Sequence, residues 1–257
     1  MGWEGASITG DRSPDRLHDT GSAANMRGVD GFVPTEAPAW NSRGERRSEM
    51  IDEHAALRAE RAAVLETIRS LDPIEWDAES LCDGWLVRDV VSHLNLNVTL
   101  KPVAAIAGLL RARGDVAVLM DRASRAARSR PIADQIQLLE QLAQSATVAP
   151  TTMRSDGAID AFVHHHDIAI PLGRDVPSDP ARLRWMADGL PQSSRFIGAA
   201  RRVEGLRLIA TDIDWHYGTG PEIRGPVAAL LVAACGRSAL DDQLEGPGLA
   251  SLQARRR

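Results

Sequence analysis

The apolar positions in the first two thirds of the chain recur at helical spacing. From about residue 50 they fall mostly on one stripe that ends at Asp72-Pro73, and similar stripes follow as far as Gly173. A period of three to four residues predicts amphipathic helices that each bury one face. Four main helices with short connections favour an antiparallel bundle. The main helices are expected at residues 50–71, 86–100, 131–148 and in a segment that contains 160–167 and ends at 171–173.

Two weaker helical patterns lie between the second and third of these helices. Pro102 interrupts the second helix, and an apolar stretch then runs to Leu110 before Gly114. Residues 115–128 are amphipathic and rich in arginine. Because proline fits best in the first turn of a helix, Pro131 predicts the start of the third main helix.

The pattern changes after Gly173. Asp179-Pro180 predicts the start of a helix that runs to about Gly198, and the alternation at residues 206–211 predicts a strand. A hairpin region at 212–220, a partner strand at 222–224 and a buried helix at 226–234 follow. These elements predict a small α/β module at the C-terminal end of a mainly α protein.

The segment before residue 45 has no apolar period of either kind. It is rich in Gly, Ser, Asp, Arg and Pro, so it buries too little apolar surface to offset the entropy of ordering. We expect disorder there, or an upstream start with Met26 or Met50 as the natural one. The expected organisation is a disordered extension at 1–45, a metal-binding helical bundle at 46–174 and the α/β module at 175–257.

The composition fits a soluble globular protein of 257 residues, with 44% hydrophobic and 25% charged residues. The net charge of -5 provides no basic field for nucleic acid or an anionic membrane. Cys82 and Cys235 form no paired motif, which favours a reducing cytoplasm, and the apolar run at 227–235 is too short to span a bilayer. We expect a cytoplasmic monomer or homodimer that binds neither nucleic acid nor membrane.

Candidate metal ligands lie in two distant segments. Asp160 and His164 stand four residues apart, so a helix presents both on one face, and His93 from a facing helix would complete a set of three. Two nitrogens and one carboxylate oxygen with a fourth position open suit a catalytic zinc ion, although nickel, iron or manganese would also fit. The alternative from spacing alone is that His93 is a satisfied polar residue and the three consecutive histidines form a solvated helix end.

Residues near these ligands have two readings each. His165 and His166 point away from the proposed face at helical spacing, which favours surface or supporting roles. Asp167 lies three residues after His164 and would either orient its imidazole or cap the end of the helix. Arg224 and Arg237 are candidates for binding a substrate carboxylate, because arginine pairs with carboxylates through two hydrogen bonds, or else are solvated surface residues.

The segment that contains His93 carries further residues with structural readings. Trp85 is expected to anchor the end of the bundle core. Arg88 and Asp89 are expected to form a local ion pair and a helix cap, because an acidic residue in the first turn suits the positive end of the helix dipole.

Three stretches together resemble one known family. Residues 80–94, Ser-Leu-Cys-Asp-Gly-Trp-Leu-Val-Arg-Asp-Val-Val-Ser-His-Leu, resemble the C-x-G-W-x-V-R-D-V-x-x-H-L signature of the mycothiol-dependent maleylpyruvate isomerase family. Residues 160–173 resemble its second signature, an acid followed after three residues by His-x-x-Asp. Residues 210–215, 220–226 and 236–237 are similar to its C-terminal module. The resemblance covers about residues 50–252.

The resemblance implies a DinB-like (YfiT-like) four-helix bundle with a small α/β C-terminal module. The metal positions of the family fall on His93, Asp160 and His164, and mycothiol is the implied thiol cosubstrate. Two positions depart from the family. The characterised isomerase type has Glu where this chain has Asp160, and a Thr-like helix cap is common where it has Leu86, a loss of about 1 kcal/mol.

These features lead to a functional hypothesis with alternatives. The first reading is a zinc-dependent enzyme that uses a low-molecular-weight thiol such as mycothiol as an isomerase or S-transferase on a small electrophile. A zinc-dependent hydrolase is the second reading, with Asp167 as the candidate general base. The third is a non-catalytic metal or small-ligand binding module, which would be favoured if His165 or His166 closed the fourth position.

Overall fold

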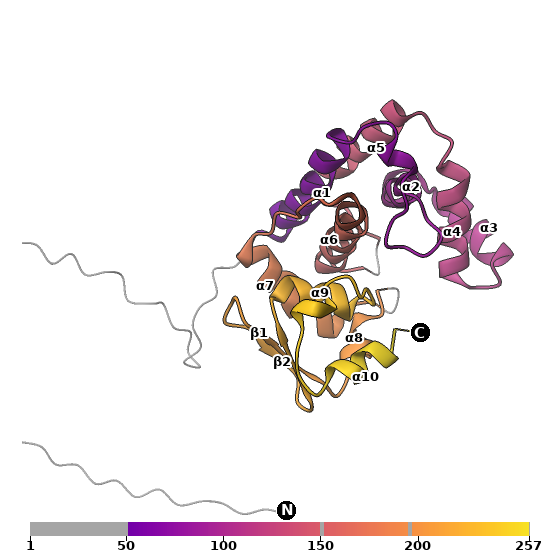
Figure 1. Cartoon of the computed structure of the whole chain (residues 1–257). Coiled ribbons are helices and arrows are strands. Elements are labelled where there is room, and N and C mark those ends of the chain that lie inside the picture. Colours follow the sequence, from indigo (N-terminus) through magenta and orange to yellow (C-terminus); the bar gives the residue numbers. More distant parts are fainter. Residues whose placement is uncertain (1–50, 150–151, 195–196, 257) are drawn as a thin grey trace, which may run out of the picture. The chain divides into compact units, whose positions relative to one another are not determined.

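The computed structural model describes residues 51–149, 152–194 and 197–256, which belong to one compact unit. This part of the chain is mostly helical, with a small three-stranded sheet near the C-terminus (Figure 1). The expected mainly α fold with a small α/β module is therefore confirmed. None of the helices in these ranges is long and apolar enough to cross a membrane. The predicted disordered extension at 1–45 lies outside the described residues.

Four helices form the bundle, as the apolar stripes predict. α1 packs against α5 and α6, and α2 packs against the same two helices (Figure 1). Asp52 caps α1, because its carboxylate accepts the free backbone N–H groups of His54 at 2.9 Å and Ala55 at 3.1 Å. The bundle helices are α1 (Glu53–Arg69), α2 (Val87–Thr99), α5 (Ile132–Gln144) and α6 (Arg154–Ala169).

Two shorter helices connect α2 to α5. α3 (Pro102–Arg111) begins with its proline in the first turn, so Pro102 does interrupt the preceding helix. α4 (Val116–Ala127) packs against α2 and carries α3 on its other side. Gly114 lies between them with a φ of 85°, a backbone conformation that glycine adopts without strain.

α6 is buried on nearly all sides and belongs to two hydrophobic clusters. Ala161 and Ile168 pack with α1, α2 and α5, whereas Phe162 and Val163 pack with residues from the C-terminal part of the chain. A helix in this position has little solvent-exposed surface, so most of its polar side chains are enclosed as well. The acidic and histidine residues of α6 must therefore find partners inside the protein.

The C-terminal helices differ from the prediction in one place. The single helix expected from Asp179 to Gly198 is wrong, because α7 ends at Gly189 and a short 3₁₀ turn follows. Pro191 lies in that turn, and proline removes a helical hydrogen bond and clashes with the preceding turn. The helices here are α7 (Pro180–Gly189), α8 (Ala199–Val203), α9 (Val227–Ala234) and α10 (Leu249–Ala254). Across the described residues, 3₁₀ turns span Glu75–Asp77, Ile170–Leu172, Leu190–Gln192 and Asp241–Gln243.

The sheet has the strand order β2-β1-β3, with β1 (Arg207–Ala210) in the centre. β2 (His216–Tyr217) pairs with β1 in the antiparallel sense, which confirms the hairpin. β3 (Glu222–Gly225) is the second partner strand, and it runs parallel to β1 on the other edge. α9 packs on β1 and β3 and also contacts α6. One hydrophobic cluster includes residues of α6, α7 and α9, and so contains residues from both sides of the predicted domain boundary at residue 174. The boundary stays a prediction.

Candidate active site

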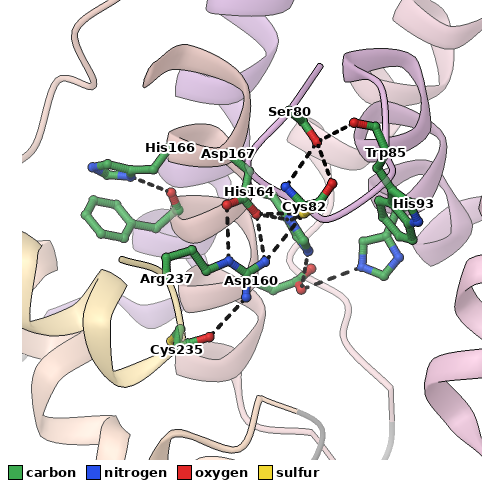
Figure 2. A network of polar contacts seen from close by, with 11 residues as sticks. Ser80, Cys82, Trp85, His93, Asp160, His164, His166, Asp167, Cys235 and Arg237 are labelled. Atoms are coloured by element: carbon green, nitrogen blue, oxygen red, sulfur yellow. Dashed lines mark hydrogen bonds and ion pairs between the residues drawn. The ribbon is translucent and has the colours of Figure 1, made fainter. Parts of the chain in front are cut away.

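α6 and α2 bring the three predicted metal ligands together. The Nε2 atom of His164 lies 3.5 Å from Oδ1 of Asp160, one turn earlier on α6. The Nε2 atom of His93, on α2, lies 3.8 Å from the same oxygen. All three ligand atoms lie within 4.8 Å of one another, and Figure 2 shows the two imidazoles converging on the carboxylate. The grouping expected from the sequence is therefore present.

This geometry fits a divalent metal ion. Zn–N and Zn–O bonds of about 2.0–2.1 Å place neighbouring ligands of a tetrahedron about 3.3 Å apart, close to the two distances observed here. The side chain of Asp160 is 32% exposed, against 18% for His93 and 10% for His164. A fourth ligand thus has a route to the site on the side of the carboxylate. Such a three-ligand set with an open side is the arrangement of catalytic zinc centres.

The charges at the site also favour a cation. Burial alone would raise the pKa of Asp160, but the nearby imidazoles of His164 and His93 outweigh it and hold the pKa well below its usual range. Burial would likewise lower the pKa of His164, but its contacts with Asp160 and Asp167 outweigh burial and raise that pKa well above its ordinary value. The imidazole of His164 therefore lies between two carboxylates that stabilise positive charge. A metal ion at Nε2 would take the place of the proton there.

A second group of residues holds the other nitrogen of His164. Its Nδ1 atom lies 2.9 Å from Oδ2 of Asp167, whose side chain is completely buried. Arg237 donates to both oxygens of this carboxylate, from Nε at 3.1 Å and from Nη2 at 2.7 Å. Burial would raise the pKa of Asp167, but the hydrogen bonds from His164 and Arg237 outweigh it and keep the pKa well below its usual range. Asp167 is thus an ionised carboxylate that orients the imidazole, in keeping with the first of its two predicted readings.

Cys82 is a member of this second group that the sequence reasoning missed. Its Sγ atom lies 3.1 Å from Oδ2 of Asp167, and the thiol donates to that oxygen (Figure 2). The backbone N–H of Leu81 donates to the carbonyl of Asp167 at 3.0 Å, which holds the loop against α6. The only signal in the sequence is the cysteine inside the first family signature. Its distance of 85 residues from Asp167 leaves no periodicity from which the contact could be predicted.

The other two histidines of α6 serve the packing of the helix. His165 lies 2.7 Å from the hydroxyl of Thr67 on α1, and burial lowers the pKa of His165 to about 4. The Nδ1 atom of His166 lies 2.8 Å from the carbonyl of Phe162. Both point away from the candidate metal ligands as predicted, but both are buried, so of the surface and supporting roles expected for them the surface role is wrong. Neither joins a group of potential metal ligands within the described part of the chain.

The two candidate arginines have different surroundings. Arg237 lies in the network around Asp167. Arg224, on β3, pairs with Glu222 at 2.8 Å and has a side chain that is 46% exposed, so it is a surface residue. The alternative reading of a solvated arginine thus describes Arg224, and the structure places it outside the site.

The residues around His93 make contacts that the sequence predicted only in part. Trp85 is half-buried, its ring lies 5.4 Å from that of His93, and its indole N–H donates to Asp121 at 2.8 Å. Asp89 accepts the backbone N–H of Leu86 at 2.9 Å, which confirms its capping role.

The predicted ion pair between Arg88 and Asp89 is wrong. Arg88 pairs with Asp77 at 2.7 Å, and Asp89 is instead held by Arg128, whose Nε donates to it at 2.8 Å. Consecutive residues on a helix point in different directions, which explains why Arg88 and Asp89 pair with other residues and not with each other.

Comparison with known proteins agrees with the sequence signatures. Residues 57–169 match the family model of the mycothiol maleylpyruvate isomerase N-terminal domain. This segment belongs to that family. The match contains all three metal-ligand candidates and Asp167, and it confirms the resemblance seen in residues 80–94 and in residues 160–169 of the second signature. Because the family is one of enzymes, the prediction that the chain is an enzyme of the isomerase type is also confirmed at the level of the family.

Two solved structures are similar to the described fold. The crystal structure of the mycothiol-dependent maleylpyruvate isomerase is 16% identical with a TM-score of 0.51, covering 76% of this chain and 92% of that chain. A histidine-to-alanine mutant of that enzyme is 14% identical with a TM-score of 0.48, covering the same shares. At this identity, the first likeness establishes a common fold. No curated protein shows significant sequence similarity to the chain.

Proposed function

We propose that this protein is a zinc-dependent isomerase that uses a low-molecular-weight thiol, with mycothiol as the first candidate, on a small electrophilic substrate. The observation that carries the proposal is the convergence of His93, Asp160 and His164 within 4.8 Å. They lie in a bundle whose sequence matches the mycothiol maleylpyruvate isomerase N-terminal domain. The partial exposure of Asp160 supports access for an external thiol.

The two histidines and Asp160 would hold the metal, and zinc, when bound, would stabilise the thiolate form of a thiol at neutral pH. The remaining work falls to residues of the chain itself. Asp167 accepts a hydrogen bond from the Nδ1–H group of His164 and so keeps the lone pair of Nε2 directed at the site. The buried surroundings of α6 keep bulk water away from the inner side of the ligand set.

The proposed reaction is a cis–trans isomerisation. The thiolate adds to one carbon of a cis double bond, and the electron pair of that bond moves onto an electron-withdrawing group of the substrate. The remaining carbon–carbon single bond rotates. Return of the electron pair then expels the thiolate and leaves the trans double bond. No proton or electron is gained or lost overall, and the thiol is regenerated.

The alternatives share the same ligand set and differ in the chemistry at its open position. An S-transferase would retain the thiol on its product, so product analysis separates it from an isomerase. A hydrolase needs a free general base, but the buried Asp167 accepts hydrogen bonds from His164, Cys82 and Arg237. A closed, non-catalytic metal centre needs a fourth protein ligand, and neither His165 nor His166 faces the site.

The test is metal content together with activity. Wild-type protein reconstituted with zinc is expected to retain about one equivalent, and a His93→Ala/His164→Ala double variant is expected to retain none. His216→Ala is the matched control, because His216 is an exposed histidine on β2. Activity is measured as thiol-dependent cis–trans conversion, with maleylpyruvate and mycothiol as the first pair.

The proposal is supported if the double variant loses both zinc and turnover while His216→Ala retains both. Turnover that persists in the double variant, or a wild type that retains no zinc, would contradict it. A cytoplasmic location, expected from two cysteines that are both free, is part of the same proposal. The choice between monomer and homodimer stays a prediction.

A further inference from the structure

We propose that Arg237 is a positioning residue, which acts on the metal site through Asp167 and does not bind substrate. This inference rests on the metal site of the proposed function. It replaces the expectation from the sequence that Arg237 would bind a substrate carboxylate.

All three nitrogens of the Arg237 guanidinium donate hydrogen bonds to protein groups. Nε and Nη2 bind the two oxygens of Asp167, and Nη1 donates to the backbone carbonyl of Cys235 at 3.0 Å. Nη2 also lies 3.7 Å from the sulfur of Cys82. The two-pronged face that would recognise a substrate carboxylate is thus occupied by Asp167 (Figure 2).

The buried carboxylate of Asp167 needs a partner of opposite charge, and Arg237 is that partner. The side chain of Asp167 has no exposed surface, and burying an unpaired carboxylate is very unfavourable. Arg237 supplies the opposite charge at 2.7 Å. An ionised Asp167 accepts hydrogen bonds only, so the proton on the neutral imidazole of His164 is held at Nδ1 and the lone pair at Nε2. Only that lone pair faces His93 and Asp160, where the metal would bind.

This chain of contacts links parts of the protein that are far apart in sequence. Arg237 follows α9, which packs with α7 and α6 in one hydrophobic cluster, whereas Asp167 lies on α6, 70 residues earlier. The metal ligands all come from the bundle helices. Through Asp167, the orientation of one ligand is set by a residue that the bundle does not contain, so metal affinity depends on the C-terminal part of the chain.

The experiment is a double-mutant cycle on zinc affinity in the full chain. Affinity is measured by competition with a chromophoric chelator for wild type, Arg237→Gln, Asp167→Asn and the double variant. Arg237→Gln is expected to weaken zinc binding roughly 10–100-fold, the usual effect of losing a partner of a metal ligand. Asp167→Asn is expected to do so at least as strongly. If Arg237 acts through Asp167, adding Arg237→Gln to Asp167→Asn changes the affinity no further.

Two further variants separate positioning from a general loss of structure. Arg224→Gln is the matched control, since it removes a surface arginine of the same module, and it should leave zinc affinity unchanged. Arg237→Lys keeps the charge but not the paired hydrogen bonds, so it should recover part of the affinity lost in Arg237→Gln. Arg237→Lys also replaces Arg237→Gln in the double-mutant cycle if the glutamine variant does not fold, as judged by circular dichroism of the metal-free protein. The visible spectrum of the cobalt-substituted protein should change in Arg237→Gln and return toward wild type in Arg237→Lys.

The outcomes separate this inference from the proposed function. An unchanged affinity in Arg237→Gln, or an equal loss in the wild-type and Asp167→Asn backgrounds, overturns the positioning role and leaves the isomerase proposal intact. The expected cycle without thiol-dependent isomerisation supports the positioning role and contradicts the isomerase proposal. A wild type that binds no zinc overturns both.

Discussion

The two nitrogens of His164 face regions of opposite character. On the Nε2 side, Asp160 lies at 3.5 Å, beyond an ordinary hydrogen bond, and its carboxylate is partly exposed. On the Nδ1 side, Asp167 lies at 2.9 Å and is completely buried, with Arg237 and Cys82 bound to it at 2.7 and 3.1 Å. One side is loose and accessible, and the other is tight and enclosed.

This difference separates holding a metal from orienting a ligand. Ligand atoms that would share an ion of about 2 Å bond length stand further apart than hydrogen-bonded atoms, as the loose side does. The tight side has short hydrogen bonds and charges that balance one another, so it has little to gain from an ion. Cys82, His164 and Asp167 also lie close enough to suggest a metal site, but the guanidinium of Arg237 already supplies the cation there.

The strongest test of the comparison is a change on the loose side. Asp160→Asn removes the only negative charge among the three ligands while preserving shape. We expect zinc affinity to fall by more than the roughly 10–100-fold typical of a supporting residue. Asp160→Glu is the matched control, because it keeps the charge and restores the residue of the characterised isomerase type, and it should retain zinc. Chelator competition measures the zinc affinity of both variants. An Asp160→Asn protein that binds zinc as tightly as wild type would show that this carboxylate is not a ligand.

A smaller effect is expected on the tight side from Cys82→Ala. The thiol is a weak donor and one of several on Asp167, so its loss should weaken zinc binding by no more than about 3-fold. Cys82→Ser keeps a donor at that position and should match wild type. The same competition assay decides, and complete loss of zinc in Cys82→Ala would show that the thiol is itself a ligand and that the two sides are not distinct.

The smallest effect is expected at the second cysteine. Cys235 is buried, and burial raises the pKa of its thiol to about 12, despite the opposing influence of Arg237. Because the thiolate is the reacting form, the folded protein at pH 8 should be alkylated by iodoacetamide at Cys82 alone, which is partly exposed. Mass spectrometry should count one label on the native chain and two after unfolding. Equal labelling of both cysteines in the folded state would show that the region around Arg237 is open to solvent.

The sequence predicted much of this architecture because helices carry local signals. The four bundle helices follow from apolar stripes, and their ends follow from residues such as Asp52 and Pro102. The three candidate metal ligands could be proposed because Asp160 and His164 are spaced by one helical turn and because His93 lies in a family signature. The predicted helix at 179–198 was wrong, since the apolar pattern continues past Pro191 whereas the backbone geometry does not.

The sequence by itself determined the four bundle helices and indicated the three candidate ligands, His93, Asp160 and His164. Only the tertiary structure decided the tight side, namely that Asp167 orients His164, that Arg237 and not Arg224 binds Asp167, and that Cys82 joins them. The physical reason is the range of the contacts. Helical spacing acts over three or four residues, whereas Arg237 lies 70 residues from Asp167 and 155 from Cys82. Contacts at that range are fixed by how α9 packs against α6, which no local pattern records.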